Sequence, residues 1–301
     1  LEKFAMKKTL IALAALASTA AFAQSSVTAY GVADLSVAKA TGAQTAASAN
    51  GTLNNGNSRF GVKGTEDLGG GLSMSFNFEQ AVNMANGATD ANTWQRNAFM
   101  ELGGGFGSLR AGRSLSPEFY ATAAFEATGT ANYSAVAALF GFGNGSRNDA
   151  NIAYTTPSLN GLKVTVGTVM AGNNSGNSKT QANAVYANGP LTVAAAYGKT
   201  ENAEKNTLIG AAYNLGVAKV AAGYYDPAGA KKGYSLGVTV PMGAWSFTAD
   251  AARDTGSATK STNTVLEAKY ALSKRTTVYA ASLNVGATSV RTTGLGVRHN
   301  F

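Results

Sequence analysis

Gly294-Leu295-Gly296-Val297-Arg298-His299-Asn300-Phe301 alternates small or polar residues with larger ones and stops on an aromatic residue. Every second side chain from Leu295 to Phe301 shares one face of an extended chain, and the residues between them share the other. This period of two is typical of a β-strand that separates two different environments. We expect this strand to pair with the first strand and close a barrel, with Phe301 at the membrane interface beside Val27.

The other end of the sequence has the pattern of an export signal. Met6-Lys7-Lys8-Thr9 is basic, residues 10–17 are apolar, and Ala21-Phe22-Ala23 is a small-x-small cleavage site. We therefore expect a secretory signal peptide over residues 1–23, with residues 1–5 upstream of a better start, and one barrel domain over residues 24–301. The apolar stretch is shorter than the roughly 20 residues that a membrane helix needs.

The composition fits an exported barrel. The sequence has 36 Gly, no Cys and only 13% charged residues, about half the charge of an average soluble domain. Without cysteine there is no disulfide framework and no thiolate site. The net charge is +8, and it falls to +6 without the signal peptide, where Lys3, Lys7 and Lys8 stand against Glu2. A basic chain suits nucleic acid, an acidic surface or an anion pathway, and export argues against nucleic acid as a partner.

Alternating segments recur along the whole sequence. In residues 72–80, Leu72, Met74, Phe76 and Phe78 oppose Ser73, Ser75, Asn77 and Glu79. Gly-, Asn- or Pro-rich turns separate such segments at residues 66–71, 103–107, 157–161, 187–190, 214–216 and 241–244, with the chemistry of specific turns. A further turn is expected at Leu272-Ser273-Lys274. The pattern predicts an all-β fold, a sixteen-stranded antiparallel transmembrane β-barrel with both termini on one side. A barrel of that size encloses an aqueous channel.

The connection from Ser114 to about Gly145 breaks this rhythm. It is too long and too rich in Phe and Tyr for an ordinary exterior loop, and long connections in compact folds are usually functional or disordered. We expect it to fold into the barrel and narrow the pore. An outer cap is the alternative interpretation.

Several motifs resemble those of a known family. They are Ser58-Arg59-Phe60-Gly61-Val62-Lys63-Gly64-Thr65-Glu66-Asp67-Leu68-Gly69-Gly70-Gly71-Leu72, Arg96-Asn97-Ala98-Phe99 with Phe106-Gly107, Gly112-Arg113, Tyr270-Ala271-Leu272-Ser273-Lys274-Arg275-Thr276 and Val297-Arg298-His299-Asn300-Phe301. In this order they resemble Gram-negative general porins, particularly the betaproteobacterial branch. The resemblance implies a homotrimer in the cell outer membrane, in contact with lipid and lipopolysaccharide. It also implies a third extracellular loop that folds inward, and passive diffusion of small hydrophilic solutes.

Selectivity depends on the charges that face the lumen. Alternation turns Arg59, Lys63 and Arg110 toward water, whereas Arg96 shares the parity of Ala98 and is predicted to point outward. Arg113 and Arg147 lie where strands meet loops, so alternation gives no direction for them. The resemblance implies that Arg59, Arg96 and Arg147 line the constriction, as an arginine cluster does in anion-selective porins of this branch. For any single arginine, a solvated interface position is an equally good interpretation.

Acidic residues complete the predicted constriction. We expect Glu118 and Glu126 on the inserted loop, and Glu79 and Glu101 on the lumenal face of their strands, to oppose the arginines. Opposite charges across a pore would create a transverse field, and rings of Arg or Lys favour anions. Small inorganic and organic anions are the predicted permeants.

Other functions have weaker support in the sequence. His299 is the one histidine, and alternation places it on the lipid side of the last strand. No Ser-His-Asp site or two-histidine metal site can therefore be built within one chain, and we expect neither an enzyme nor a metal or cofactor. The Tyr and Trp residues, including Tyr30, Tyr225, Trp245 and Tyr279, are predicted to form a membrane girdle. The alternatives are a ligand-specific channel for sugars or phosphate-type solutes and a structural or adhesive barrel.

Overall fold

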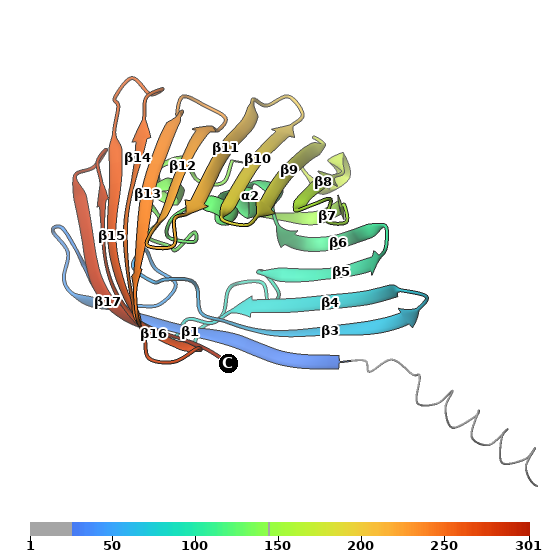
Figure 1. Cartoon of the computed structure of the whole chain (residues 1–301), viewed down its shortest axis with the longest axis horizontal. Coiled ribbons are helices and arrows are strands. Elements are labelled where there is room, and N and C mark those ends of the chain that lie inside the picture. The colour runs from blue at the N-terminus through green and yellow to red at the C-terminus, as the bar shows by residue number, and fades with distance from the viewer. Residues whose placement is uncertain (1–25, 144) are drawn as a thin grey trace, which may run out of the picture.

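The computed structural model describes residues 26–143 and 145–301, so the predicted signal peptide lies outside the described residues. Within them, seventeen strands form one sheet that curves into a ring (Figure 1). The first half of the sheet contains β1 (Ser26–Ala40), β2 (Ala46–Ser48), β3 (Arg59–Gly69), β4 (Leu72–Ala81), β5 (Asn97–Gly104), β6 (Gly107–Leu115), β7 (Arg147–Thr155) and β8 (Leu162–Val169). The second half contains β9 (Lys179–Asn188), β10 (Leu191–Thr200), β11 (Lys205–Asn214), β12 (Lys219–Asp226), β13 (Gly233–Met242), β14 (Trp245–Asp254), β15 (Thr262–Ala271), β16 (Thr276–Val285) and β17 (Val290–Asn300).

The barrel is antiparallel and closed by its first and last strands. Each barrel strand pairs with its sequence neighbours, and Val32 to Ala40 of β1 pair with Asn300 to Thr292 of β17. The three-residue β2 lies in the first long loop and pairs only with Ser36, Val37 and Ala38, near the end of β1. The described residues therefore form sixteen barrel strands, as the sequence predicts, and none of their helices is long and apolar enough to cross a membrane.

Side chains alternate between the two faces as the sequence predicts. On β1, Asp34 and Ser36 are buried inside, while Leu35 and Val37 are 42% and 55% exposed outside. On β17, Leu295 is exposed and its neighbours Gly294 and Gly296 are buried. Polar groups thus face the interior and apolar groups face outward, which is the pattern of a membrane barrel.

The register of the closing strand differs from the prediction. The backbone N–H groups and carbonyls of Gly31 and Phe301 bond each other at 3.0 and 3.1 Å, whereas Val27 pairs with Gly64 of β3. The prediction that Phe301 lies beside Val27 is wrong by four residues. Strands of a barrel are tilted and staggered, so the start of β1 runs past the closing seam.

One predicted turn is shorter than expected. β3 continues through Glu66 and Asp67, which pair with Met74 and Ser73, so the reversal uses only Gly70 and Gly71. Both glycines have positive φ, 61° and 82°, a conformation that glycine adopts without steric cost. Three consecutive glycines shortly after Glu66 and Asp67 suggested a wider loop than the chain needs.

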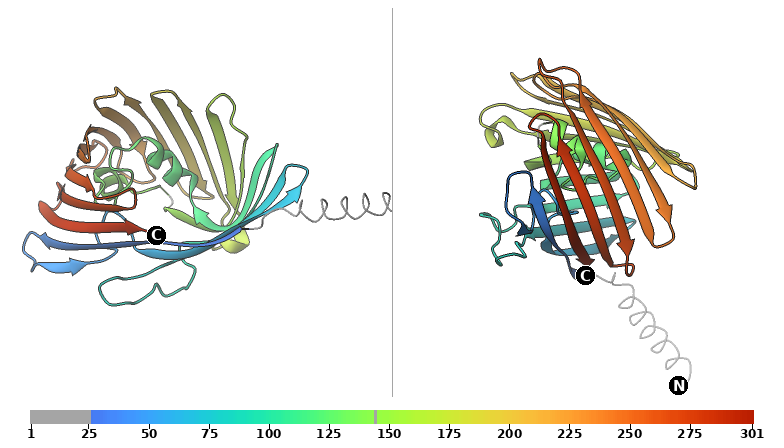
Figure 2. Two further views of the ribbon diagram at one scale, coloured as in Figure 1. Left: turned by 60° about the horizontal axis from the view of Figure 1, so that its bottom comes forward. Right: turned by 90° about the vertical axis from the view of Figure 1, so that its left-hand side faces the viewer.

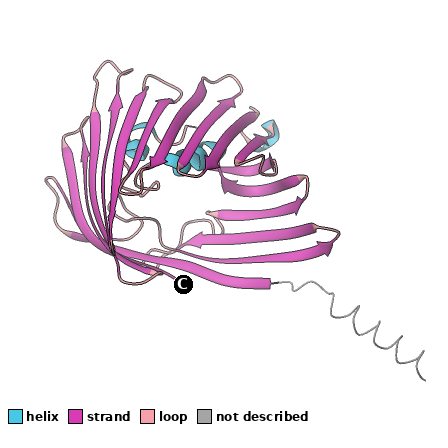
Figure 3. Ribbon diagram, in the orientation of Figure 1, coloured by secondary structure: helices cyan, strands magenta, loops and turns pink. Residues whose placement is uncertain are grey.

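The connection between β6 and β7 lies inside the ring and contains two helices (Figure 3). α2 (Pro117–Phe125) packs against β9, β10 and β11, and α3 (Ala135–Phe140) packs against β14, β15 and β16. The Ser116 side chain accepts a hydrogen bond from the Phe119 N–H and so caps α2. Two further views show the same enclosure (Figure 2). We name residues 116–143, together with 145 and 146, the inner loop.

Apolar packing joins the inner loop to one side of the wall. Phe140 stacks on Tyr225 with ring centroids 5.0 Å apart. A Cβ on Gly210 would lie 2.2 Å from the Phe125 ring, so the glycine makes room for it. Tyr225 and Tyr279 are buried inside, and the Tyr30 hydroxyl bonds Glu79 inside at 2.9 Å. These three tyrosines therefore do not belong to the predicted girdle, whereas Trp245 is exposed outside and stacks on Phe247.

Candidate pore constriction

A chamber of about 720 Å³ lies between the inner loop and one side of the wall. The wall contributes four arginines and one carboxylate, which are Arg59, Arg96, Arg147, Arg298 and Glu79. The inner loop contributes apolar, hydroxyl and amide groups, among them Phe119, Thr130, Asn132 and Phe142. The first long loop adds Asn50, Asn55 and Asn57. The charged side of this chamber thus faces a neutral side.

Glu79 is the centre of the charged side. Its carboxylate lies 2.7 Å from Arg96 Nε and 3.4 Å from Arg59 Nε. Its side chain is only 7% exposed, and it also accepts the Tyr30 hydroxyl hydrogen bond. β4 positions Glu79 on the inner face, next to β3, because it alternates with the outward Phe78.

The other two arginines are held by neutral acceptors. Arg147 Nε donates to the Arg96 carbonyl at 2.7 Å, and Arg298 Nη1 donates to Asn55 Oδ1 at 3.0 Å. Neither has an ion pair with a carboxylate among the described residues. Four guanidinium charges less one carboxylate charge leave an excess of three positive charges around the chamber. Two like charges about 4 Å apart repel by about 1 kcal/mol even in water, so a passing anion would relieve this repulsion.

The direction of Arg96 corrects the prediction from alternation. Its side chain points inward to Glu79 and is 12% exposed. Arg96 precedes the first residue of β5, and its N–H donates to the Glu79 carbonyl at 3.1 Å. Alternation holds only within a strand, so it did not apply at this position. The structure brings Arg59, Arg96 and Arg147 together.

Three other predicted basic residues lie outside this chamber. Lys63 is near the Tyr30 ring, 5.2 Å from its centroid, and Arg110 is paired with Glu101 at 2.7 Å. Both are nearer the short-turn end of their strands than the arginine cluster is. Arg113 bonds Asp149 and the Gln95 carbonyl, because a bulge after Gly112 shifts the register of β6 against β7. These residues do not line the 720 Å³ chamber.

The prediction that Glu118 and Glu126 oppose the arginines is wrong. Glu118 is 1% exposed and accepts a hydrogen bond from the Gln181 amide of β9. Its burial raises the pKa of the carboxyl above its ordinary value. Glu126 accepts hydrogen bonds from Thr128 and Ser134 within the inner loop, each at 2.8 Å. Both carboxyl groups serve the packing of the loop, so the predicted field between loop acids and wall arginines is absent from the described residues.

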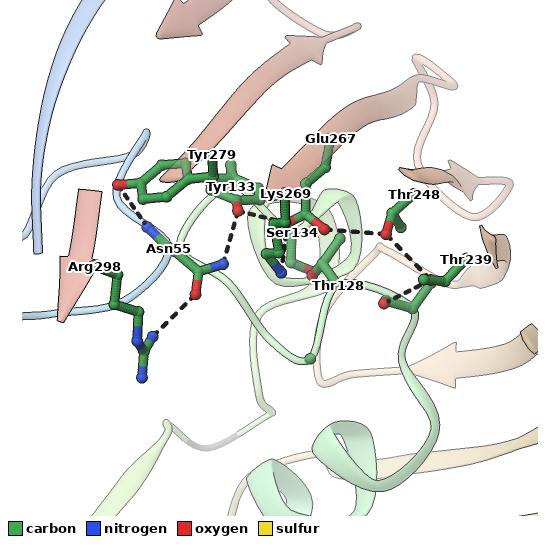
Figure 4. Close-up of polar contacts among 12 residues, drawn as sticks. Asn55, Thr128, Tyr133, Ser134, Thr239, Thr248, Glu267, Lys269, Tyr279 and Arg298 are labelled. Carbon is green, nitrogen blue, oxygen red and sulfur yellow. Dashed lines mark hydrogen bonds and ion pairs between the residues drawn. The ribbon is translucent and has the colours of Figure 1, made fainter. Parts of the chain in front are cut away.

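A chain of buried and partly buried hydrogen bonds fixes the inner loop to the wall (Figure 4). The Tyr133 hydroxyl donates to Glu267 at 2.5 Å and accepts from the Asn55 amide at 2.7 Å. Asn55 also accepts from Arg298 and donates its N–H to the Tyr279 hydroxyl. Burial raises the pKa of Tyr133 well above its usual range, and the nearby Glu267 raises it further. Tyr133 therefore keeps its proton and acts as a donor.

Arg298 is the member of the chamber that sequence reasoning did not single out. The alternation of residues 294–301 already placed it on the inner face with Gly296. Its proximity to Arg59 follows only from the closure of β17 on β1. His299 lies on the outer face, bonded to the Thr276 hydroxyl at 2.9 Å. Within the described residues, no group of three His, Cys, Asp or Glu side chains could hold a metal ion.

A closed barrel with an apolar outside, a polar inside and a charged inner chamber defines a pore-forming protein of the outer membrane. The chain belongs to the Gram-negative porin family, whose sequence profile matches residues 9–287. The fold and family are those of channels rather than enzymes.

Individual relatives agree with this assignment. Outer membrane porin protein 32 of Delftia acidovorans is 38% identical over 177 residues, which are 54% of this chain and 49% of that protein. An outer membrane porin of Bordetella pertussis is 33% identical over 250 residues, which are 67% of this chain and 61% of that protein. The matches thus span about half of these relatives' length. Both organisms are betaproteobacteria, so the resemblance found in the motifs is confirmed.

The fold also agrees with solved porin structures. The anion-selective porin from Comamonas acidovorans superposes with a TM-score of 0.77 at 24% identity, over 92% of this chain and all of that one. The trimer form of OmpT from Vibrio cholerae superposes with a TM-score of 0.73 at 15% identity, over 92% of this chain and 99% of that one. At 24% and 15% sequence identity, these two similarities show a shared fold and nothing more.

Proposed function

We propose that this chain is a diffusion porin that prefers anions. The observation that carries the proposal is the chamber beside the inner loop, where four arginines meet one carboxylate. Small hydrophilic solutes would cross passively, and inorganic and organic anions would cross most easily. A homotrimer surrounded by outer-membrane lipid and lipopolysaccharide is the proposed assembly. The fold shared with a trimeric porin supports that assembly.

The chamber favours anions through charge and donors together. A guanidinium offers five N–H donors and stays charged at any physiological pH. Arg147 and Arg298 each donate a hydrogen bond to a neutral oxygen atom, and neither has a carboxylate partner among the described residues. Their positive charge is therefore free to attract the solute. The attraction of about 1 kcal/mol for a pair at 4 Å in water grows as the dielectric falls. Conduction also needs weak binding, which a chamber of about 720 Å³ allows.

The geometry gives less support to the other two functions. A sugar-specific channel needs an ordered track of aromatic rings, whereas Phe119 and Phe142 are the aromatic residues that line this chamber and both belong to the inner loop. Their centroids are 4.9 Å apart, so they pack on each other. An adhesive barrel would not require three excess positive charges inside. Measurements of single-channel conductance can distinguish the diffusion porin from the sugar-specific channel and the adhesive barrel.

Planar bilayers under a salt gradient provide the test. We expect stepwise conductance with a reversal potential that favours anions. Replacing Arg59, Arg96 and Arg147 together with Gln should abolish this preference, since it changes the chamber from three excess positive charges to none. Arg291→Gln is the control, because Arg291 is exposed on the outer face of β17. No stepwise conductance would contradict the porin proposal, and unchanged selectivity in the triple variant would contradict the role of the cluster.

A further inference from the structure

A second chamber lies beyond the first turn of α2, toward the short turns of the barrel. Its volume is about 340 Å³, and it is enclosed by α2 and the inner faces of β6, β7 and β8. Leu115 lines both chambers, whereas Phe119 faces the first and Tyr120 the second. A solute that leaves the arginine cluster toward the short-turn side therefore meets this second chamber. Small-molecule sites usually have volumes of about 300–1,000 Å³.

The second chamber carries one unbalanced positive charge. It contains Arg110 and Lys163. Arg110 is neutralised by Glu101 at 2.7 Å, whereas Lys163 has no carboxylate within ion-pair distance among the described residues. Lys163 shares the inward parity of Gly167 and Val169 and is exposed to the lumen. The electrostatic complement of this site is a solute with a single negative charge.

Neutral polar groups surround that charge. The Tyr120 hydroxyl accepts a hydrogen bond from Arg110 Nη1 at 3.3 Å, which leaves its own proton available. The Thr155 and Thr165 hydroxyls lie 3.0 Å apart on adjacent strands. Ser114 and Asn151 border the chamber, and each has a buried polar atom without a hydrogen-bond partner. Unpaired buried polar atoms are uncommon and call for an explanation.

The remaining wall is apolar, formed by Leu115, Pro117 and Ala153. The combination of one cation, several hydroxyls and a small apolar surface matches a solute that has one acid group, several hydroxyls and a carbon backbone. Chloride would use only the cation, and a neutral polyol would use only the hydroxyls.

We propose that this chamber, which we name the exit subsite (Arg110, Tyr120, Thr155, Lys163 and Thr165), binds small polyhydroxylated monoanions of the sugar-acid type. This inference rests on the proposed function, since the solute reaches the subsite through the pore. The exit subsite would hold such solutes briefly after the arginine cluster and so give them an advantage over simple anions. Lys163 provides the charge, and the hydroxyls distinguish the solute.

Gluconate is the probe, with acetate as the anion without the polyol chain and sorbitol as the polyol without the charge. We expect gluconate to interrupt single-channel chloride current at lower concentrations than either control does. Lys163→Gln should weaken the interruption by about fivefold, the effect of one charge at close range in water. Lys163→Arg should restore it. Lys219→Gln is the matched control, because Lys219 also lies on the inner face near the short-turn side but lines neither chamber.

Calorimetric titration of gluconate into the folded protein in detergent gives a readout that does not depend on conduction. Equal affinity of the wild type and Lys163→Gln, or equal affinity for gluconate and acetate, would overturn the exit subsite. Either result in a protein that still conducts anions would leave the proposed function intact. A protein that binds gluconate through Lys163 but passes no current would overturn the proposed function and retain the subsite.

Discussion

At the scale of single residues, Glu79 controls the balance of charge in the constriction. It is the one carboxylate of the arginine chamber, and Arg59, Arg96 and Tyr30 all contact it. It organises two arginines in fixed directions and cancels one of their charges. Removing it would separate these two effects, because the chamber would gain net charge while the arginines lose their anchor.

We therefore predict opposite changes in selectivity and stability for Glu79→Gln. The excess charge rises from three to four, so the reversal potential should move further toward anions. Loss of hydrogen bonds to a charged group should lower the free energy of unfolding by about 1.5–3 kcal/mol, measured by thermal or denaturant unfolding in detergent. Glu101→Gln is the control, since Glu101 pairs with Arg110 outside the arginine chamber. A shift toward cations would contradict the charge count.

Single residues also show which side-chain directions could be predicted from the sequence and which could not. Alternation correctly turned Arg59 inward, because Arg59 lies within a regular strand. It failed for Arg96, which lies one residue before a strand. It also could not show that Glu118 and Glu126 are buried where the inner loop packs. Which acceptors a loop side chain meets depends on tertiary packing, and a single sequence has no periodic signal for that packing.

At the scale of elements, hydrogen bonds hold the inner loop to the wall at several places, and two of them involve the strands β9 and β15. Near its start, the Asn183 amide donates to the Pro117 carbonyl at 2.8 Å, and Gln181 bonds Glu118. Further along, Tyr133 bonds Glu267 of β15. Two anchors on different strands restrict both the sliding and the rotation of the loop, so the width of the chamber depends on both.

Tyr133→Phe should loosen the second anchor. The change removes the donor to Glu267 and leaves a buried acceptor that still has Thr248 at 3.0 Å and Lys269 at 2.9 Å. We expect a loss of about 1 kcal/mol of unfolding free energy and noisier open-channel current, because the loop then samples more positions. Single-channel recording measures the noise, and Tyr197→Phe on the exposed outer face is the control. Current as quiet as in the wild type would show that Tyr133 does not hold the loop.

The strands were predictable from their periodicity, whereas the helices of the inner loop have no periodic signal in the sequence. Alternation and turn residues indicated all sixteen barrel strands, because each strand separates water from lipid and must repeat with a period of two. α2 has only nine residues and α3 has six, too short for a helical period to stand out. Ser116-Pro117-Glu118 at the start of α2 is nevertheless a recognisable helix start, and it would have revealed α2.

At the scale of the whole molecule, the constriction exists only because the barrel closes. Arg59 belongs to β3 and Arg298 to β17, and β1 pairs with both strands. More than two hundred residues separate these arginines in the sequence, yet both line one chamber. The closing seam thus supplies part of the charge that would select anions, and an error in its register would move Arg298 away from the cluster.

Phe301 offers a way to weaken that seam without touching the pore. Its backbone exchanges two hydrogen bonds with Gly31, and its ring covers Gly31 so closely that a Cβ there would lie 2.3 Å from it. Phe301→Ala keeps the backbone bonds but removes the ring, so we expect fewer molecules to reach the folded barrel, measured as the yield of folded protein during refolding into lipid vesicles.

Conductance and reversal potential of the molecules that do insert should match the wild type, because the Phe301 ring does not line the arginine chamber. Leu295→Ala provides the comparison. Leu295 is 67% exposed on the outer face of the same strand, so its loss should change the yield less. An equal yield for Phe301→Ala and the wild type would show that the seam is set by backbone pairing alone. A changed reversal potential would instead show that the ring fixes the register that brings Arg298 to Arg59.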